Sequence, residues 1–158
     1  KDVINELLAQ GLEIILPWWS DEEKARVLRL KNNDSRVHLL PNLNLSQKAT
    51  VLSGAIVSVS LDTGLAHMAA ALNVPNVCIY GPTDPHSIGT IGRKQMHVTA
   101  SNPPCAPCLR SYCTYEDETP FKPACMASIS STPVIEALHH IMEIKVSYSD
   151  PAVITELS

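Results

Sequence analysis

A short polar turn between two apolar runs carries the side chains with the most evident chemistry. It reads DTGLAH from Asp62 to His67, and it follows the apolar stretch 55–60. A strand that enters such a turn and continues as a helix leaves several backbone N–H groups exposed at the helix start, where anions bind. The turn therefore predicts a site for a phosphate-bearing ligand.

The segments around this turn alternate between expected strands and expected helices. The apolar runs that we interpret as strands are 12–16, 37–40, 55–60, 76–80 and 95–99. This alternation is typical of βαβ units, and it predicts an α/β fold with a Rossmann-like parallel sheet and helices on both faces. Polar turns follow several of these strands, and the carboxyl ends of parallel strands share one edge, where ligands bind. We therefore expect these turns to line one site.

Capping patterns and proline mark the starts of three expected helices. Ser20 with Glu23 three residues later forms a capping box, and Ser46 is the expected cap of the next helix. Pro133 fits the first turn of a last helix. The stretch 65–72 is apolar nearly all round, so we expect this helix to be buried against the sheet.

The composition describes a mildly acidic globular chain of 158 residues with a net charge of −4. There is no long lysine and arginine stripe, which argues against a nucleic-acid partner. No apolar run is long enough to span a membrane and no signal peptide opens the chain, so we expect a cytoplasmic location. The chain begins at Lys1, directly in a helical pattern, and we expect it to be a fragment of a longer protein.

A cysteine-rich excursion at 101–131 interrupts the regular pattern with prolines and little periodicity. Its cysteines offer four soft ligands, enough for a tetrahedral zinc or iron site, and they are Cys105, Cys108, Cys113 and Cys125. Reduced thiols in a loop, or disulfides formed on handling, are the alternatives that the spacing leaves open. In either case a structural role is expected. We interpret 1–145 as one domain that contains this excursion, and 146–158 as a C-terminal tail.

Several separate motifs, in order along the first 96 residues, resemble the lipopolysaccharide heptosyltransferase family. The main ones are DTGLAH (62–67), AALNVP (70–75) and YGPTDP (80–85). Further segments are similar to the heptosyltransferase I branch of that family, namely LPW (16–18), LPNLNL (40–45) and GRKQ (92–95). The resemblance implies the C-terminal half of a GT-B glycosyltransferase, which has two Rossmann-like domains.

The resemblance also implies a reaction, the inverting transfer of heptose from ADP-heptose to the lipopolysaccharide inner core, without a catalytic metal. In that family the C-terminal domain binds the donor, and the N-terminal domain carries the acceptor site and the catalytic base. We therefore expect a donor-binding domain without the base, at most peripherally associated with the inner face of the inner membrane. Two alternatives stay open: a GT-B transferase using another nucleotide sugar, and a non-catalytic nucleotide-binding or metal-knotted module.

Within this resemblance, the turn after the third expected strand holds the diphosphate. Thr63 and Gly64 would contact the phosphates, whereas Asp62 would accept hydrogen bonds from the helix start or from a sugar hydroxyl. His67, when protonated, would neutralise charge on the leaving diphosphate. The simpler alternatives are an ordinary helix cap with a glycine for a tight turn, and a core-facing histidine.

Residues of three other segments are expected to reach the other parts of the donor. Glu23, or its neighbour Glu22, would bind the ribose hydroxyls, although the capping box alone explains Glu23. Leu43 matches a position that contacts the adenine mainly through the backbone. Thr83 and Asp84 would reach the sugar, and they are equally good turn formers.

Overall fold

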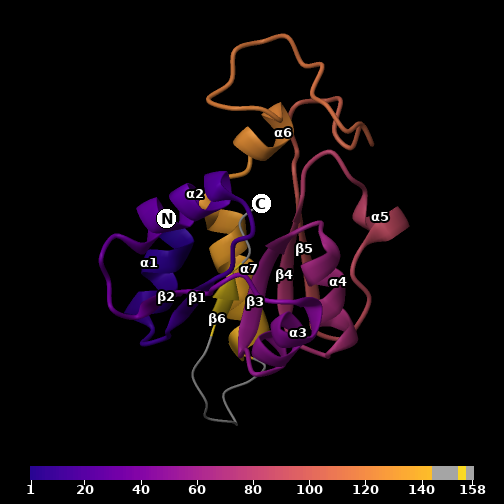
Figure 1. Cartoon of the computed structure of the whole chain (residues 1–158). Helices are drawn as coiled ribbons and strands as arrows, with labels where there is room; N and C mark the ends of the chain where they lie inside the picture. The colour runs from indigo at the N-terminus through magenta and orange to yellow at the C-terminus, as the bar shows by residue number, and fades with distance from the viewer. Residues whose placement is uncertain (144–152, 156–158) are drawn as a thin grey trace.

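The computed structural model describes residues 1–143 and 153–155, which form a parallel sheet flanked by helices (Figure 1). The strands are β1 (Ile14–Leu16), β2 (Val37–Leu39), β3 (Val57–Leu61), β4 (Asn76–Tyr80), β5 (Gln95–Thr99) and β6 (Val153–Thr155). The helices are α1 (Asp2–Ala9), α2 (Asp21–Lys31), α3 (Leu45–Ser53), α4 (Gly64–Ala71), α5 (Pro85–Ile88), α6 (Ala124–Ala127) and α7 (Ser131–Glu143). No helix of this described part is long and apolar enough to cross a membrane.

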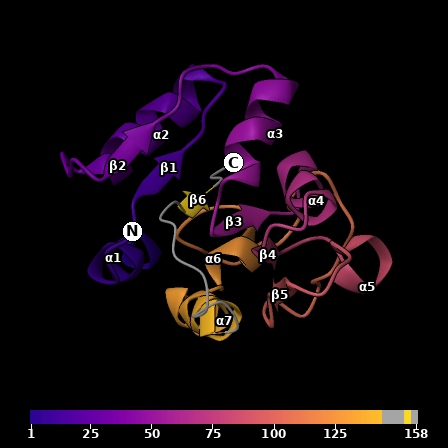
Figure 2. The ribbon, with the colours of Figure 1, turned by 90° about the horizontal axis from the view of Figure 1, so that it is seen from below.

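Helices cover both faces of the sheet, as the sequence predicts. Figure 2 shows α3 and α4 on one side of the strands and α1 and α7 on the other. The larger core joins α1, α2 and α7 to the sheet through fully buried side chains, among them Leu7, Val27 and Leu138. A smaller core holds Leu52 of α3 against Ala69 of α4. The predicted Rossmann-like fold is therefore confirmed.

The strand order β2-β1-β6-β3-β4-β5 defines where a ligand would sit in this sheet. The chain passes from β1 through α2 to β2 in one direction, and from β3 through α4 to β4 in the other. In doubly wound sheets the crossovers diverge at such a point, and a crevice opens there at the carboxyl ends of the strands. Strand β6 lies at this point, inside the stretch 146–158 that we interpret as a tail. The other residues of that stretch lie outside the described residues.

Two expectations about helices need correction. The cap of α3 is Asn44, not Ser46: the Asn44 side chain accepts from the Gln47 N–H, and the Gln47 side chain accepts from the Asn44 N–H. The second correction concerns α4, where only Ala66 and Ala69 are buried, so it presents one face to the sheet. An alanine-rich helix needs no second packing face, because alanine favours helix formation wherever it lies.

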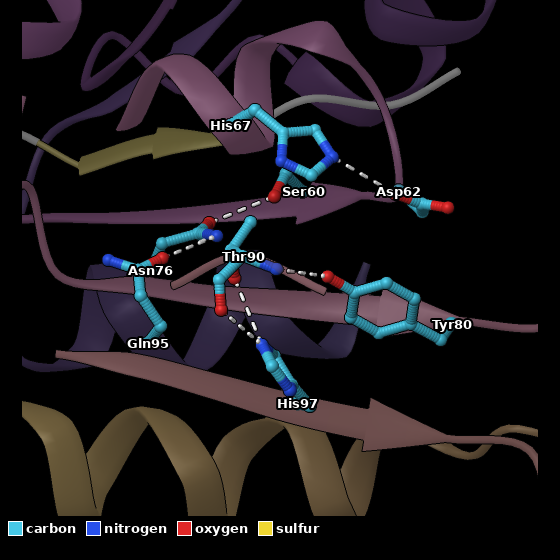
Figure 3. Close-up of polar contacts among 8 residues, drawn as sticks. All are labelled: Ser60, Asp62, His67, Asn76, Tyr80, Thr90, Gln95 and His97. Atoms are coloured by element: carbon cyan, nitrogen blue, oxygen red, sulfur yellow. Dashed lines mark hydrogen bonds and ion pairs between the residues drawn. The ribbon is translucent and has the colours of Figure 1, made fainter. Parts of the chain in front are cut away.

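A row of buried polar side chains crosses β3, β4 and β5. Asn76 is opposite Ser58 on β3 and opposite Gln95 on β5. The hydroxyls of Ser58 and Ser60 both donate to Asn76 Oδ1, each at 2.8 Å. Asn76 Nδ2 donates to Gln95 Oε1 at 3.3 Å, and Figure 3 shows this bond together with the one from Ser60. Buried polar groups require such partners, so the row fixes the register of the three strands.

Candidate functional site

A cavity of about 670 Å³ opens at the carboxyl ends of β3 and β4. The last residue of β3 with the turn after it (61–63) and the turn after β4 (81–83) form one part of its lining. Arg26 of α2 lines it from another element, and 121–123 and Met126 of the cysteine-rich excursion form a further wall. The cavity lies where the topology predicts a ligand, and it contains three of the residues expected from the sequence, namely Asp62, Thr63 and Thr83.

Asp62 and His67 form a pair that the sequence analysis did not anticipate. Asp62 Oδ1 lies 3.4 Å from His67 Nε2, so the two side chains form an ion pair when His67 is protonated (Figure 3). The Asp62 side chain is 13% exposed and the His67 side chain 49% exposed, so His67 is not a core histidine. His67 does not line the cavity itself, but it reaches the cavity wall through Asp62.

Backbone N–H groups are exposed at the start of α4, and no side chain of Thr63 or Gly64 caps them. Thr63 is the N-cap residue, with extended backbone dihedrals, and its side chain does not make the usual capping hydrogen bond. Gly64 has an ordinary φ, and a Cβ built on it would meet no atom within 4 Å. The fold therefore does not require glycine here for a tight turn, and the open space suits the close approach of an anion to the helix start.

The two residues that the sequence predicts in the turn after β4, Thr83 and Asp84, have different roles. Asp84 caps α5, because its carboxylate accepts from the His86 N–H at 2.9 Å and from the Ser87 hydroxyl at 3.0 Å. The His86 N–H, with help from Ser87, lowers the pKa of Asp84. Asp84 is thus a turn former, while Thr83 remains on the cavity wall.

Tyr80, the last residue of β4, supports the start of the turn after β4 through its buried side chain. Its ring is fully buried and packs edge-on against His97, with 5.1 Å between the ring centroids. Its hydroxyl oxygen accepts from the Thr90 N–H at 3.0 Å (Figure 3). Burial raises the pKa of Tyr80 to about 12, so the side chain stays neutral and serves as a structural support.

Glu23 is engaged by the start of its own helix. Its Oε2 accepts from the backbone N–H groups of Trp19 and Ser20, and the Ser20 hydroxyl oxygen accepts from the Glu23 N–H. The predicted capping box is therefore confirmed, and Glu23 does not line the cavity. Ribose binding by Glu23 stays a prediction.

Arg26, three residues after Glu23, lines the cavity and was not anticipated. Among the described residues its side chain makes no hydrogen bond or ion pair, so its guanidinium is available to an anion. Arg26 lies three residues after the predicted site residue Glu23, so both are on the same face of helix α2, and this spacing could have predicted its position.

Leu43 and Gly64 do not belong to the cavity lining. Leu43 is half-buried in the loop between β2 and α3. Its contact with an adenine ring, and the phosphate contact of Gly64, therefore stay predictions.

The four cysteines of the excursion gather around one small pocket of about 70 Å³. None of these four cysteines forms a disulfide. Backbone N–H groups of Ala124 and Tyr115 approach the Cys113 sulfur and lower its pKa, whereas burial raises the pKa of Cys125. Within the described residues, no three or more histidine, cysteine or acidic side chains are arranged as a ready metal site. The metal site therefore stays a prediction.

The doubly wound sheet and the cavity at its strand ends define a Rossmann-like domain of the kind that forms half of a GT-B glycosyltransferase. The comparison with protein families agrees with this class. The chain belongs to glycosyltransferase family 9, the heptosyltransferases, whose family model matches residues 1–118.

Individual relatives support the same assignment. Lipopolysaccharide heptosyltransferase 1 of Pseudomonas aeruginosa PAO1 is 42% identical over 116 residues, which cover 73% of this chain and 32% of that protein. The E. coli heptosyltransferase WaaC with ADP has a TM-score of 0.70 and 33% identity, over 89% of this chain and 37% of that one. The same enzyme with ADP-2-deoxy-2-fluoro heptose has a TM-score of 0.66 and 31% identity, over 88% and 36%. The chain thus spans about a third of the length of these relatives.

Proposed function

We propose that this chain is the donor-binding domain of a heptosyltransferase, which transfers heptose from ADP-heptose to the lipopolysaccharide inner core. The observation that carries the proposal is the cavity between the start of α4 and Arg26, at the switch point of the sheet. The likeness to WaaC structures that hold ADP and an ADP-heptose analogue supports ADP as the nucleotide. A nucleotide-sugar donor would place the reaction in the cytoplasm, at the inner face of the inner membrane, where the lipopolysaccharide acceptor is reached.

The diphosphate would lie between the N–H groups at the start of α4 and the guanidinium of Arg26. Lys122, the other cation on the cavity wall, already donates through Nζ to the carbonyl oxygens of Tyr115 and Asp117, at 2.5 and 3.1 Å. Arg26 has no such partner in the described part of the chain. Because guanidinium groups bind phosphates through charge-assisted hydrogen bonds, Arg26 is the side chain best placed to hold the donor.

The pair of His67 and Asp62 would act when the bond between the sugar and the diphosphate breaks. Negative charge then grows on the departing ADP, and a protonated His67 held by Asp62 would stabilise it from beside the helix start. Inversion at the sugar requires the acceptor hydroxyl to attack from the opposite face. The carboxylate base for that step belongs, by family resemblance, to the other Rossmann-like domain.

Calorimetry with nucleotides tests the proposal directly. We expect ADP to bind the 158-residue chain and UDP to bind about tenfold more weakly or not at all, because the two bases differ in size and hydrogen-bonding groups. Failure of ADP to bind both this chain and the intact protein that contains it would overturn the proposal. Tighter binding of UDP would instead indicate a GT-B transferase for another nucleotide sugar. ADP binding without heptose transfer by the intact protein would indicate a non-catalytic module.

Replacing Arg26 by methionine is expected to weaken ADP binding by about ten- to hundredfold, because one charge-assisted hydrogen bond contributes roughly 1.5 to 3 kcal/mol. Adenosine, which lacks phosphates, should bind both proteins equally. The matched control is Arg29→Met, which changes an exposed arginine of the same helix outside the cavity. Equal ADP affinities in the wild type and in Arg26→Met would show that Arg26 does not contact the diphosphate.

A further inference from the structure

We propose that the four thiols of the cysteine-rich excursion bind one zinc or iron ion, and that this ion fixes the excursion as a wall of the donor cavity. The binding of the ion is independent of the proposed function, whereas its effect on the donor rests on it. The ion would thereby hold the excursion, which has little apolar core of its own, in place beside the donor cavity.

The excursion has almost no core of its own. Over 101–123 the structure has no helix or strand, and Pro103 is the one residue of that range that is buried. Its large apolar side chains are exposed, with Leu109 66% exposed and Phe121, on the cavity wall, 56% exposed. Without apolar burial, little offsets the entropy lost on ordering the backbone, which is about 1–2 kcal/mol per residue. Segments of this kind are commonly held by a disulfide or a metal.

The chemistry of the thiols favours a metal as that link. All four line the same pocket, and Cys105 and Cys108 have the two-residue spacing of a chelating pair. Cys125 is buried while Cys105 is exposed, so ligation would draw the outer thiols toward the buried one. Each sulfur that forms a bond to the metal releases its proton to solvent, and the free energy of binding then stabilises the fold.

The thiol pocket and the donor cavity share walls. Pro82 and Pro123 line both of them. The Leu109 N–H donates to the Pro82 carbonyl at 2.7 Å, and the Cys125 sulfur lies 3.1 Å from where a Cβ of Gly81 would be. Figure 1 shows the excursion and α6 above the carboxyl end of β4. A shift of the thiols would therefore displace the turn after β4, which lines the donor cavity.

Elemental analysis of the purified 158-residue chain tests the metal site. We expect about one zinc or iron ion per chain, as for a four-thiolate structural site, and loss of that ion in the double variant Cys105→Ser and Cys113→Ser. Ser111→Ala, in the same pocket but without a thiol, is the control and should keep the ion. Cobalt(II) added to the metal-free chain should show thiolate-to-cobalt absorption. A chain without metal that also fails to bind cobalt would overturn the proposal.

Two measurements test whether the ion fixes the wall. Trypsin should cleave after Arg110 faster in the metal-free chain, while cleavage after the exposed Arg93, outside the excursion, should not change. Removal of the metal should also weaken ADP binding by about tenfold, within the usual range of coupling between sites. Unchanged cleavage and unchanged ADP affinity would overturn the coupling. If Arg110 were protected by the metal but neither this chain nor the intact protein bound ADP, the metal site would stand and the proposed function would be rejected.

Discussion

Replacing Asn76 by leucine is expected to lower the free energy of unfolding by about 3 kcal/mol, because two buried hydroxyls lose their acceptor at roughly 1 to 3 kcal/mol each. Asn76 is fully buried, and Ser58 and Ser60 beside it are 3% and 1% exposed. Leucine has a similar volume, so the loss reflects hydrogen bonding rather than a cavity. Urea unfolding with an unchanged dependence on denaturant is the measurement.

Two further variants make this test specific. Asn5→Leu changes an exposed asparagine on α1 and should shift the unfolding midpoint little. The triple variant that combines Asn76→Leu with Ser58→Ala and Ser60→Ala should recover much of the loss, because replacing all partners by apolar groups removes the unpaired hydroxyls. A loss below about 1 kcal/mol in Asn76→Leu would contradict the role given to the polar row.

The strands next to the site could be predicted because residue types in the sequence mark where these strands begin and end. The predicted ranges 76–80 and 95–99 agree with β4 and β5. Proline or glycine precedes each of these runs within a few residues. The first run is apolar after Asn76, and in the second run polar and apolar residues alternate. The start of α3 was placed wrongly because Asn44 and Ser46 are both good caps two residues apart, and only the reciprocal bonds with Gln47 decide between them.

The site itself was predictable only where chain order and strand ends determine it. Asp62, Thr63 and Thr83 follow two adjacent strands, so the parallel sheet alone brings them to one cavity. Phe121 and Lys122 reach the same cavity from a segment without periodicity, and no local pattern places such a segment in space. Strand β6 was missed for a similar reason, since its three residues are too short a run to show a period.

Replacing Gly64 by alanine is expected to keep or slightly raise the stability of the fold while weakening ADP binding by about tenfold or more. The reason is that a methyl group would block a close backbone contact to a phosphate, and a charge-assisted hydrogen bond contributes roughly 1.5 to 3 kcal/mol. A Cβ at this position meets no protein atom within 4 Å, and φ is not positive. Alanine at a compatible position stabilises a protein by about 0.4 to 1 kcal/mol through the unfolded state. The new methyl group, however, would occupy the space through which a phosphate reaches the N–H groups of α4. Thermal unfolding and calorimetry with ADP measure the two effects separately.

Gly54→Ala is the matched control for this substitution. Gly54 follows α3 just before β3, at the opposite end of that strand from Asp62, and its φ of −87° also suits alanine. A Cβ there would meet only the Val51 carbonyl oxygen, at 3.6 Å, which is an ordinary contact. Both variants should therefore fold, and only Gly64→Ala should lose ADP affinity. If the two bound ADP equally well, the diphosphate would not lie over the start of α4, and the open space above Gly64 would need another explanation.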